Sequence, residues 1–332
     1  MSEPRKKNQA IKLSLKILFV FGLLYFLAKK GFISVDDTRH AITQWRYSIP
    51  GLCGLVFTSF LGVIRWQWLL KAHNVRLPFW RTFQLTYIGV FFNIALPGSV
   101  SGDFVKAFYV GKEAPGQRTK AFGSIAFDRV AGLSALVVLS AICFLIEMAS
   151  MADSAFLKAL QLFVTVAAAV VIAFYGYLFL VRERHDPLLK VMGALEARFP
   201  RLGPFTRLYE ALRHYHSHRV TVLKVLALSL ALWCGVGWSI QQFALAMGET
   251  QLHLLPLYVI VPIGLLITAI PVLPAGVGTG HAAFLYLFSL LGSQRGADIF
   301  SIYILAQIGT GALGGLVYLR FRATAPAPAL PA

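Results

Sequence analysis

Charged side chains are scarce in this chain of 332 residues: they make up 14% of it, whereas hydrophobic residues make up 57%. Acidic residues are the scarcest, with 14 Asp and Glu against 31 Lys and Arg, so the formal net charge is +17. Apolar runs long enough to cross a bilayer recur along the whole chain. The composition therefore predicts an all-α polytopic membrane protein. Its positive charge indicates loops that lie against anionic lipid rather than a nucleic-acid partner.

Cysteine is nearly absent, and the motifs of common enzymes are missing. All three cysteines fall inside apolar runs, as small buried hydrophobic residues do: Cys53, Cys143 and Cys234. The alternating His214, His216 and His218 have no Cys or carboxylate beside them to complete a metal site. The chain contains no nucleophile elbow, no phosphate-binding GxxxxGK loop and no HExxH. We therefore expect no enzymatic activity, no cofactor and no metal.

Two stretches of the chain resemble each other. They are Asn93-Ile-Ala-Leu-Pro-Gly-Ser-Val-Ser-Gly-Asp103 and Ile270-Pro-Val-Leu-Pro-Ala-Gly-Val-Gly-Thr-Gly-His281. Each is a Leu-Pro step into a cluster of small residues inside an apolar segment, which is typical of a broken membrane helix. Broken backbone survives at membrane depth only where it lines a protein-buried or water-filled cavity. A matched pair of breaks therefore points to the transport site of a carrier built from repeats.

The apolar runs predict eight elements, at about residues 11–28, 49–70, 82–111, 121–148, 157–181, 220–247, 254–291 and 298–319. We expect six of them to cross the membrane, and 82–111 and 254–291 to be broken, re-entrant hairpins. The first run ends at Lys29 and Lys30 without a small-residue cleavage site, so it is predicted to be a retained helix rather than a signal peptide.

The placement of Lys and Arg predicts the orientation. With this arrangement the inside segments carry 20 Lys and Arg and the outside segments six, which places both termini in the cytoplasm of a bacterial inner membrane. Segment 182–219 becomes a cytoplasmic amphipathic stretch, and 323–332 an Ala/Pro-rich disordered tail. Residues 1–150 and 151–322 then form two inverted halves, with one hairpin entering from each face.

Ionisable residues inside apolar elements are functional or paired by default, because charge is costly in hydrocarbon. Those of the candidate substrate site are Arg65, Asp103, Lys106, Asp128, Arg129 and His281. Residues of the two broken stretches complete it: Asn93, Gly98, Ser99, Ser101, Gly276 and Gly278. The helix start beyond the first glycine cluster would offer backbone N–H groups to a phosphate.

Each charged residue has an alternative role. Arg65 either faces a cavity or snorkels to the interface beside Trp66 and Trp68. Lys106 either supplies a charge to a phosphate or pairs with Asp103 on the same helix face.

The neighbours on the next element, Asp128 and Arg129, leave a similar choice. Asp128 could pair with Arg65 or Lys106 and leave Arg129 for a lipid phosphate, or all of these residues could form a closed structural network. His281 could titrate and gate proton coupling, or simply be hydrogen-bonded.

Several ordered motifs resemble a known family. They are Arg65-Trp66 after Gly62, the run Phe92-Asn93 to Lys106, Phe127-Asp128-Arg129, and Pro271-Val-Leu-Pro274-Ala-Gly276-Val-Gly278. They are similar to the membrane domain of lysylphosphatidylglycerol synthases, which also occurs alone in small flippase-like proteins. In that family an Arg usually follows the Gly-Asp pair, and this chain has Lys106 there. An acidic residue often follows the second glycine cluster in the family, and this chain has His281 there. The resemblance implies lipid translocation without the synthase domain.

Three functional hypotheses remain open. The first is an ATP-independent flippase or scramblase for an anionic, phosphate-bearing lipid, whose partners are membrane lipids and their head groups. The second is a scaffold for a lipid or glycan synthesis complex, and the third an intramembrane enzyme acting on a lipid phosphate, with Asp103 or Asp128 as base. Gly311 and Gly315 would let another helix approach closely, inside the bundle or in a homo-oligomer.

Overall fold

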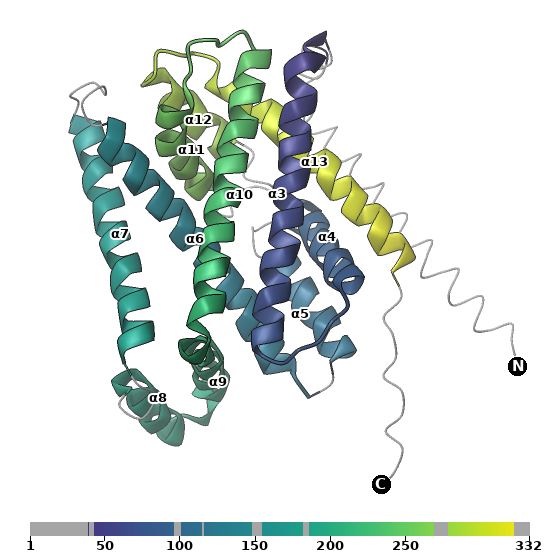
Figure 1. Cartoon of the computed structure of the whole chain (residues 1–332), viewed down its shortest axis with the longest axis vertical. Coiled ribbons are helices and arrows are strands. Elements are labelled where there is room, and N and C mark those ends of the chain that lie inside the picture. The colour runs from purple at the N-terminus through teal and green to yellow at the C-terminus, as the bar shows by residue number, and fades with distance from the viewer. Residues whose placement is uncertain are drawn as a thin grey trace, which may run out of the picture.

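The computed structural model describes residues 39, 43–95, 101–114, 116–147, 155–181, 186–268 and 278–321. Across these ranges every regular element is a helix, which confirms the all-α class (Figure 1). The expected first helix, 11–28, and the tail, 323–332, lie outside the described residues.

Five long helices match the expected crossing elements. They are α3 (Trp45–Ala72), α6 (Arg118–Glu147), α7 (Ala155–Leu180), α10 (Arg219–Ala246) and α13 (Gly296–Arg320). All five are long and apolar enough to cross a membrane. Their outward side chains fit a lipid environment: on α7, for example, Leu162, Ile172 and Leu180 are 66%, 71% and 81% exposed. Exposed apolar surface of this kind is unfavourable in water and favourable in the hydrocarbon core of a bilayer.

The first broken element is two helices, α4 (Phe79–Ala95) and α5 (Ser101–Glu113), that run antiparallel. A Cβ added to Gly89 would lie 2.7 Å from the Lys106 side chain, and one added to Gly102 would overlap the carbonyl of Gly89. Asn93 also pairs with Gly102, so residue numbers fall along one helix as they rise along the other. The element therefore returns to the end of the bundle from which it came.

The second broken element has the same construction in α11 (Leu254–Thr268) and α12 (Thr279–Ser289). A Cβ on Gly264 would lie 2.6 Å from Phe284, and one on Gly280 would lie 2.8 Å from Thr268, so these helices are antiparallel too. In Figure 1 this pair lies in the upper half of the bundle, whereas α4 and α5 lie in the lower half. Both expected breaks are thus confirmed. The division into two inverted halves at residue 150 stays a prediction.

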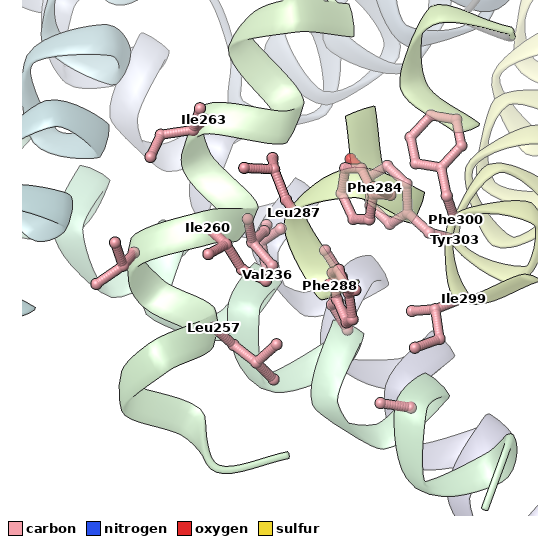
Figure 2. Packing of buried hydrophobic residues seen from close by; sticks show 14 of the residues in the cluster. Val236, Leu257, Ile260, Ile263, Phe284, Leu287, Phe288, Ile299, Phe300 and Tyr303 are labelled. Atoms are coloured by element: carbon pink, nitrogen blue, oxygen red, sulfur yellow. The ribbon is translucent and has the colours of Figure 1, made fainter. Parts of the chain in front are cut away.

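Aromatic and branched side chains hold the second pair in place. Phe284 and Phe288 of α12 pack among Ile260 of α11 and Ile299 and Phe300 of α13 (Figure 2). These five side chains are all 0 or 1% exposed. The burial of each such side chain contributes about 1.5–3 kcal/mol. This cluster fixes α12 between α11 and α13.

Helix α13 packs closely on α4 through its glycines. A Cβ on Gly314 would overlap the carbonyl of Tyr87, and one on Gly311 would overlap the end of Ile94. Gly311, one of the two small residues that the sequence singled out, therefore packs inside the bundle, and the other, Gly315, is buried. The use of this face in a homo-oligomer stays a prediction.

Segment 186–218 forms a layer across one end of the bundle, here called the α8–α9 end. It contains α8 (Pro187–Arg198), a 3₁₀ turn at Pro200–Leu202, α9 (Gly203–Arg213) and a second 3₁₀ turn, η3 (His214–His218). His214 Nε2 lies 3.1 Å from the carbonyl of Ala72, and His216 Nδ1 lies 2.8 Å from that of Leu178. The alternating histidines thus cap the ends of α3 and α7.

Arg213 fastens α9 to the end of α7. Its guanidinium donates to the carbonyls of Leu178 and Val181, at 3.1 and 2.6 Å. Its charge is balanced by Asp186, 2.8 Å away, which also caps α8 by accepting from the N–H of Leu189. Burial opposes the charged form of Asp186, but hydrogen bonds from Tyr177, Leu189 and Tyr209 and the charge of Arg213 outweigh it and lower the pKa of the carboxyl.

The close contact of α4 with α5 is directly testable. Gly102→Ala should lower the free energy of unfolding by about 1–3 kcal/mol or more, because the added methyl group meets the carbonyl of Gly89 rather than a side chain that can turn away. The measurement is thermal unfolding of the purified protein in detergent. Gly309→Ala in α13 is the matched control, since a Cβ there meets nothing within 4 Å. Equal stability of the two variants would contradict the packing described here.

Candidate functional site

A cavity of about 720 Å³, largely apolar in its lining but with several charged side chains, lies between α3, α4, α5, α6, α10, α11 and α13. Predicted site residues that line it are Arg65, Asn93, Asp103, Lys106, Asp128 and Arg129. Thr268 and Gln307 line it as well, and they come from the second half of the chain. The cavity therefore receives side chains from both broken elements, through α4 and α5 on one side and the end of α11 on the other.

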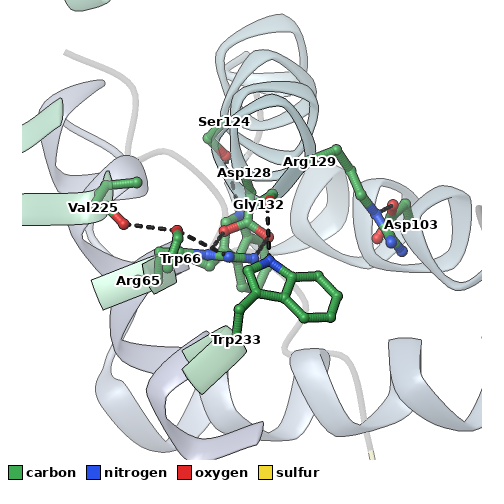
Figure 3. A network of polar contacts seen from close by, with 10 residues as sticks. Arg65, Trp66, Asp103, Ser124, Asp128, Arg129, Gly132, Val225 and Trp233 are labelled. Carbon is green, nitrogen blue, oxygen red and sulfur yellow. Dashed lines mark hydrogen bonds and ion pairs between the residues drawn. The ribbon is translucent and has the colours of Figure 1, made fainter. Parts of the chain in front are cut away.

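Arg65 and Asp128 form a two-pronged ion pair between α3 and α6 (Figure 3). Arg65 Nε and Nη2 donate to the two carboxylate oxygens of Asp128 at 2.7 and 3.0 Å, and Nη1 donates to Ser229 of α10 at 3.1 Å. The two side chains are only 11% and 12% exposed. Gly132, one turn beyond Asp128, leaves room for the guanidinium, which lies 3.2 Å from where its Cβ would be.

This geometry decides two of the open alternatives. Arg65 faces the cavity and does not snorkel to the interface, and Asp128 pairs with Arg65 rather than with Lys106. A forked pair of this kind is among the strongest hydrogen-bonded arrangements in proteins. Since it joins α3, α6 and α10, it also fixes the wall of the cavity.

Arg129 pairs with Asp103 of α5, its Nε donating to Asp103 Oδ2 (Figure 3). Of the two alternatives for Lys106, the ion pair with Asp103 within α5 is therefore not formed. Arg129, which one hypothesis left for a lipid phosphate, is itself paired with a carboxylate. The reason is the rotation of α5, which turns Asp103 toward α6. The Arg129 side chain is nevertheless 43% exposed and lines the cavity, whereas that of Asp103 is 8% exposed.

Lys106 differs from the two arginines of the described cavity wall because it forms no ion pair with a carboxylate. It is 6% exposed, its stem packs under Gly89, and its ammonium lies 4.0 Å from the centre of the Trp66 ring. Trp66 is itself held by a 3.2 Å hydrogen bond from Nε1 to Ser124. Within the part of the chain that the structure describes, no acidic oxygen lies within 4 Å of the Lys106 ammonium.

The charges of the described cavity wall do not cancel. Arg65, Lys106 and Arg129 face only two carboxylates, those of Asp103 and Asp128. Both carboxylates are engaged by arginine, so the excess positive charge is that of Lys106. A cation–π contact is weak compensation for a charge taken out of water. The cavity is therefore electrostatically complementary to one further negative charge.

Asn93 closes the start of α5. Its Oδ1 accepts from the N–H of Gly102 at 2.8 Å, so a side chain of α4 satisfies one of the free N–H groups at this helix end. That N–H was a predicted phosphate ligand and is occupied here. Ser101 lies in the same first turn but is not among the residues that line the cavity.

The second glycine-rich stretch contributes less to the described cavity. Gly278 caps α12 with a φ of +84° and donates its N–H to His281 Nδ1 at 3.3 Å. His281 Nε2 lies 3.1 Å from Ser301 Oγ of α13, so this histidine is hydrogen-bonded between α12 and α13 and does not line the cavity. Predicted site residues Gly98, Ser99 and Gly276 lie outside the described residues.

Four polar residues of the site were not predicted from the sequence. Ser229 accepts from Arg65, Trp233 Nε1 donates to the carbonyl of Gly132 at 2.8 Å, and Thr268 and Gln307 line the cavity from the second half. Each is a polar side chain inside an apolar run. The rule that singled out the charged residues would have found them had it been extended to neutral polar groups.

These features define a class: a polytopic helical membrane protein with a cavity that carries charged side chains and receives residues from both of its broken elements. The chain belongs to the family described as the lysylphosphatidylglycerol synthase TM region, whose model matches residues 13–317. A relative described as a UPF0104 membrane protein, from Pyrococcus horikoshii, is 23% identical over 133 residues. That match covers 39% of this chain and 40% of the relative. No solved structure is significantly similar to the chain.

The Arg65–Asp128 pair can be tested by a double-mutant cycle. Asp128→Asn should destabilise the protein by about 3–5 kcal/mol, because it leaves the buried Arg65 without its counter-charge. Arg65→Met alone should have a similar effect. The double variant Arg65→Met, Asp128→Asn should lose much less than the sum of the two single changes, as measured by thermal unfolding in detergent. Simple additivity of the two single changes would show that the pair is not the interaction that holds α3 to α6.

Proposed function

We propose that this protein is an ATP-independent flippase or scramblase for an anionic, phosphate-bearing lipid. The observation that supports it is the unpaired cation Lys106, buried in the wall of a cavity whose other charges are matched. A buried charge without a partner is unfavourable, so a fold keeps one where a ligand supplies the opposite charge. A lipid phosphate carries that charge.

The mouth of the cavity suits a lipid rather than a free phosphate. Phe104 of α5 and Leu133 of α6 line the cavity and are 63% and 48% exposed, and Leu133 lies one turn from the half-exposed Arg129. Apolar side chains at this position would face acyl chains if the helices span the bilayer. In the proposed mechanism the head group enters past Arg129 toward Lys106, while the tails stay in hydrocarbon.

Translocation further requires access from both faces. The two helix pairs, α4 with α5 and α11 with α12, turn back from opposite ends of the bundle, and both elements contribute to the cavity wall. We propose that they belong to two inverted halves that open the cavity alternately to each side. We also propose the bacterial inner membrane as the location, with the α8–α9 end in the cytoplasm.

The alternative hypotheses fit the cavity less well. An enzyme acting on a lipid phosphate needs a free base, whereas Asp103 and Asp128 are both held by arginine. A scaffold has no use for an uncompensated buried cation, because removal of that charge would only stabilise it. The scaffold hypothesis therefore makes the opposite prediction for Lys106.

Lys106 is the decisive position. Lys106→Met should reduce translocation of fluorescent phosphatidylglycerol in proteoliposomes by at least about 10-fold, the effect of losing one charge-assisted contact of 1.4 kcal/mol or more. It should keep or raise the unfolding temperature, since it removes a desolvated charge. Lys112→Met, on the exposed part of the same helix, is the control and should transport normally.

Either of two outcomes would contradict the proposal. Normal translocation by the Lys106→Met protein would place the phosphate site elsewhere and leave the scaffold hypothesis ahead. A strongly destabilised Lys106→Met protein would show that this charge serves the fold. Lys106→Arg keeps the charge. It should therefore retain part of the translocation activity, both from the inner to the outer leaflet and in the reverse direction.

The orientation is testable by labelling in a background without the three native cysteines. A cysteine at position 250, between α10 and α11, should react with an impermeant reagent added outside the cell. Cysteines at positions 76 and 200, at the α8–α9 end, should react only after the membrane is opened. The reverse pattern would mean that the α8–α9 end faces outward, and the proposed location of the termini would then be wrong.

A further inference from the structure

A second pocket lies on the outside of the bundle, at the seam between α3 and α10. Its volume is about 350 Å³, and it opens at the α8–α9 end. Two facing stripes line it: Trp68, Lys71 and Ala72 from the last turns of α3, and Thr221 and Lys224 from the start of α10 with His218, which caps it. The spacings of three and four residues place each stripe on one helix face. We call this pocket the basic groove.

The basic groove is separate from the cavity. Lys71 follows Arg65 by six residues on α3, a rise of about 9 Å along the helix. Arg65 points into the bundle toward Asp128 and Ser229, whereas Lys71 and Lys224 are exposed. A ligand in the groove would thus neither contact Lys106 nor require the cavity to open.

The chemistry of the groove selects an anion. It contains two lysines and a histidine and no acidic side chain. Among the described residues, neither Lys71 nor Lys224 has a carboxylate within 4 Å. His218 Nδ1 is held 3.0 Å from Ser217 Oγ, which leaves Nε2 as the ring nitrogen available to the groove. Thr221 adds a hydroxyl. Two ammonium groups, an imidazole and a hydroxyl match a phosphodiester.

The position of the groove selects a lipid as the source of that phosphate. It lies at the end of α3 and the start of α10, which is the depth of head groups and interfacial tryptophans if these helices span the bilayer. Beside it, Val220 and Leu223 of α10 are 65% and 58% exposed and could contact acyl chains. Basic pockets between membrane helices at this depth bind anionic head groups.

We infer that the basic groove binds the phosphodiester head group of an anionic phospholipid of the leaflet at the α8–α9 end. This lipid is bound beside the bundle and is not the translocated one. By bridging Lys71 and Lys224 it would join the end of α3 to the start of α10, the two helices that Arg65 and Ser229 also connect.

Native mass spectrometry of the full chain from detergent micelles containing phosphatidylglycerol or phosphatidylcholine tests this inference. The wild-type protein should retain phosphatidylglycerol in preference to phosphatidylcholine. The double variant Lys71→Gln, Lys224→Gln should bind it about 30-fold more weakly, from the loss of two lysines near the lipid surface. The matched control, Arg76→Gln with Lys190→Gln, removes two exposed charges at the same end and should bind as the wild type does.

Two further variants separate the possible causes. In the Lys106→Met background, where the cavity has lost its free cation, Thr221→Trp fills the groove without changing its charge and should abolish the remaining retention, even if the double lysine variant folds poorly. Lys106→Met should keep the groove lipid, so failure of the proposed transport site would not be mistaken for failure of the groove.

Three outcomes would overturn the inference. Equal loss in the Arg76 and Lys190 control would mean diffuse attraction to a basic surface. Retention unchanged in both groove variants would mean that the lipid binds elsewhere. Displacement of the lipid by millimolar glycerol 3-phosphate would mean that the groove takes a soluble phosphate and not a lipid.

Discussion

The cavity depends on one interaction, the forked ion pair between Arg65 and Asp128. It crosses from α3 to α6, and through Ser229 it reaches α10, so three long helices meet at one guanidinium. In a medium that cannot solvate charge, separating the two partners is costly, so the pair favours one arrangement of these helices against each other. The second pair, Asp103 with Arg129, repeats the device between α5 and α6. Both ion pairs involve a charged residue of α6, so α6 is the helix to which α3 and α5 are held.

Charge matching also explains why the remaining lysine matters. The two ion pairs use every carboxylate of the described cavity wall, so the Lys106 ammonium, 4.0 Å from the centre of the Trp66 ring, has no carboxylate of its own. A cavity whose charges cancelled would not attract a charged head group, which loses hydration when it passes apolar side chains. A site with one uncompensated cation attracts an anion but holds it through few contacts, and a transported ligand must also be released.

Much of the fold could be predicted from the sequence, and the pairing of the charges could not. The elements at 49–70, 121–148 and 220–247 were foreseeable because apolar run length alone determines a membrane helix. The breaks were foreseeable because Pro and Gly interrupt such runs. The choice of Arg129 over Lys106 as partner of Asp103 depends on how α5 is rotated against α4, and the contact of Gly102 with the backbone of Gly89 sets that rotation. Such a contact joins residues of two helices and leaves no local pattern.

Helix α7 is attached to the protein mainly at its two ends. Near its start, Leu157, Leu160 and Val164 are buried in the cluster that includes Leu139 and Phe144 of α6, and at its other end Arg213 caps its carbonyls. Between these anchorages Val166, Val170 and Ile172 are at least half exposed. A helix of 26 residues is about 39 Å long and hardly compressible, so α7 acts as a spacer between the two ends of the bundle. The bilayer must therefore accommodate, by its thickness or by helix tilt, a helix none of whose described residues lines the cavity.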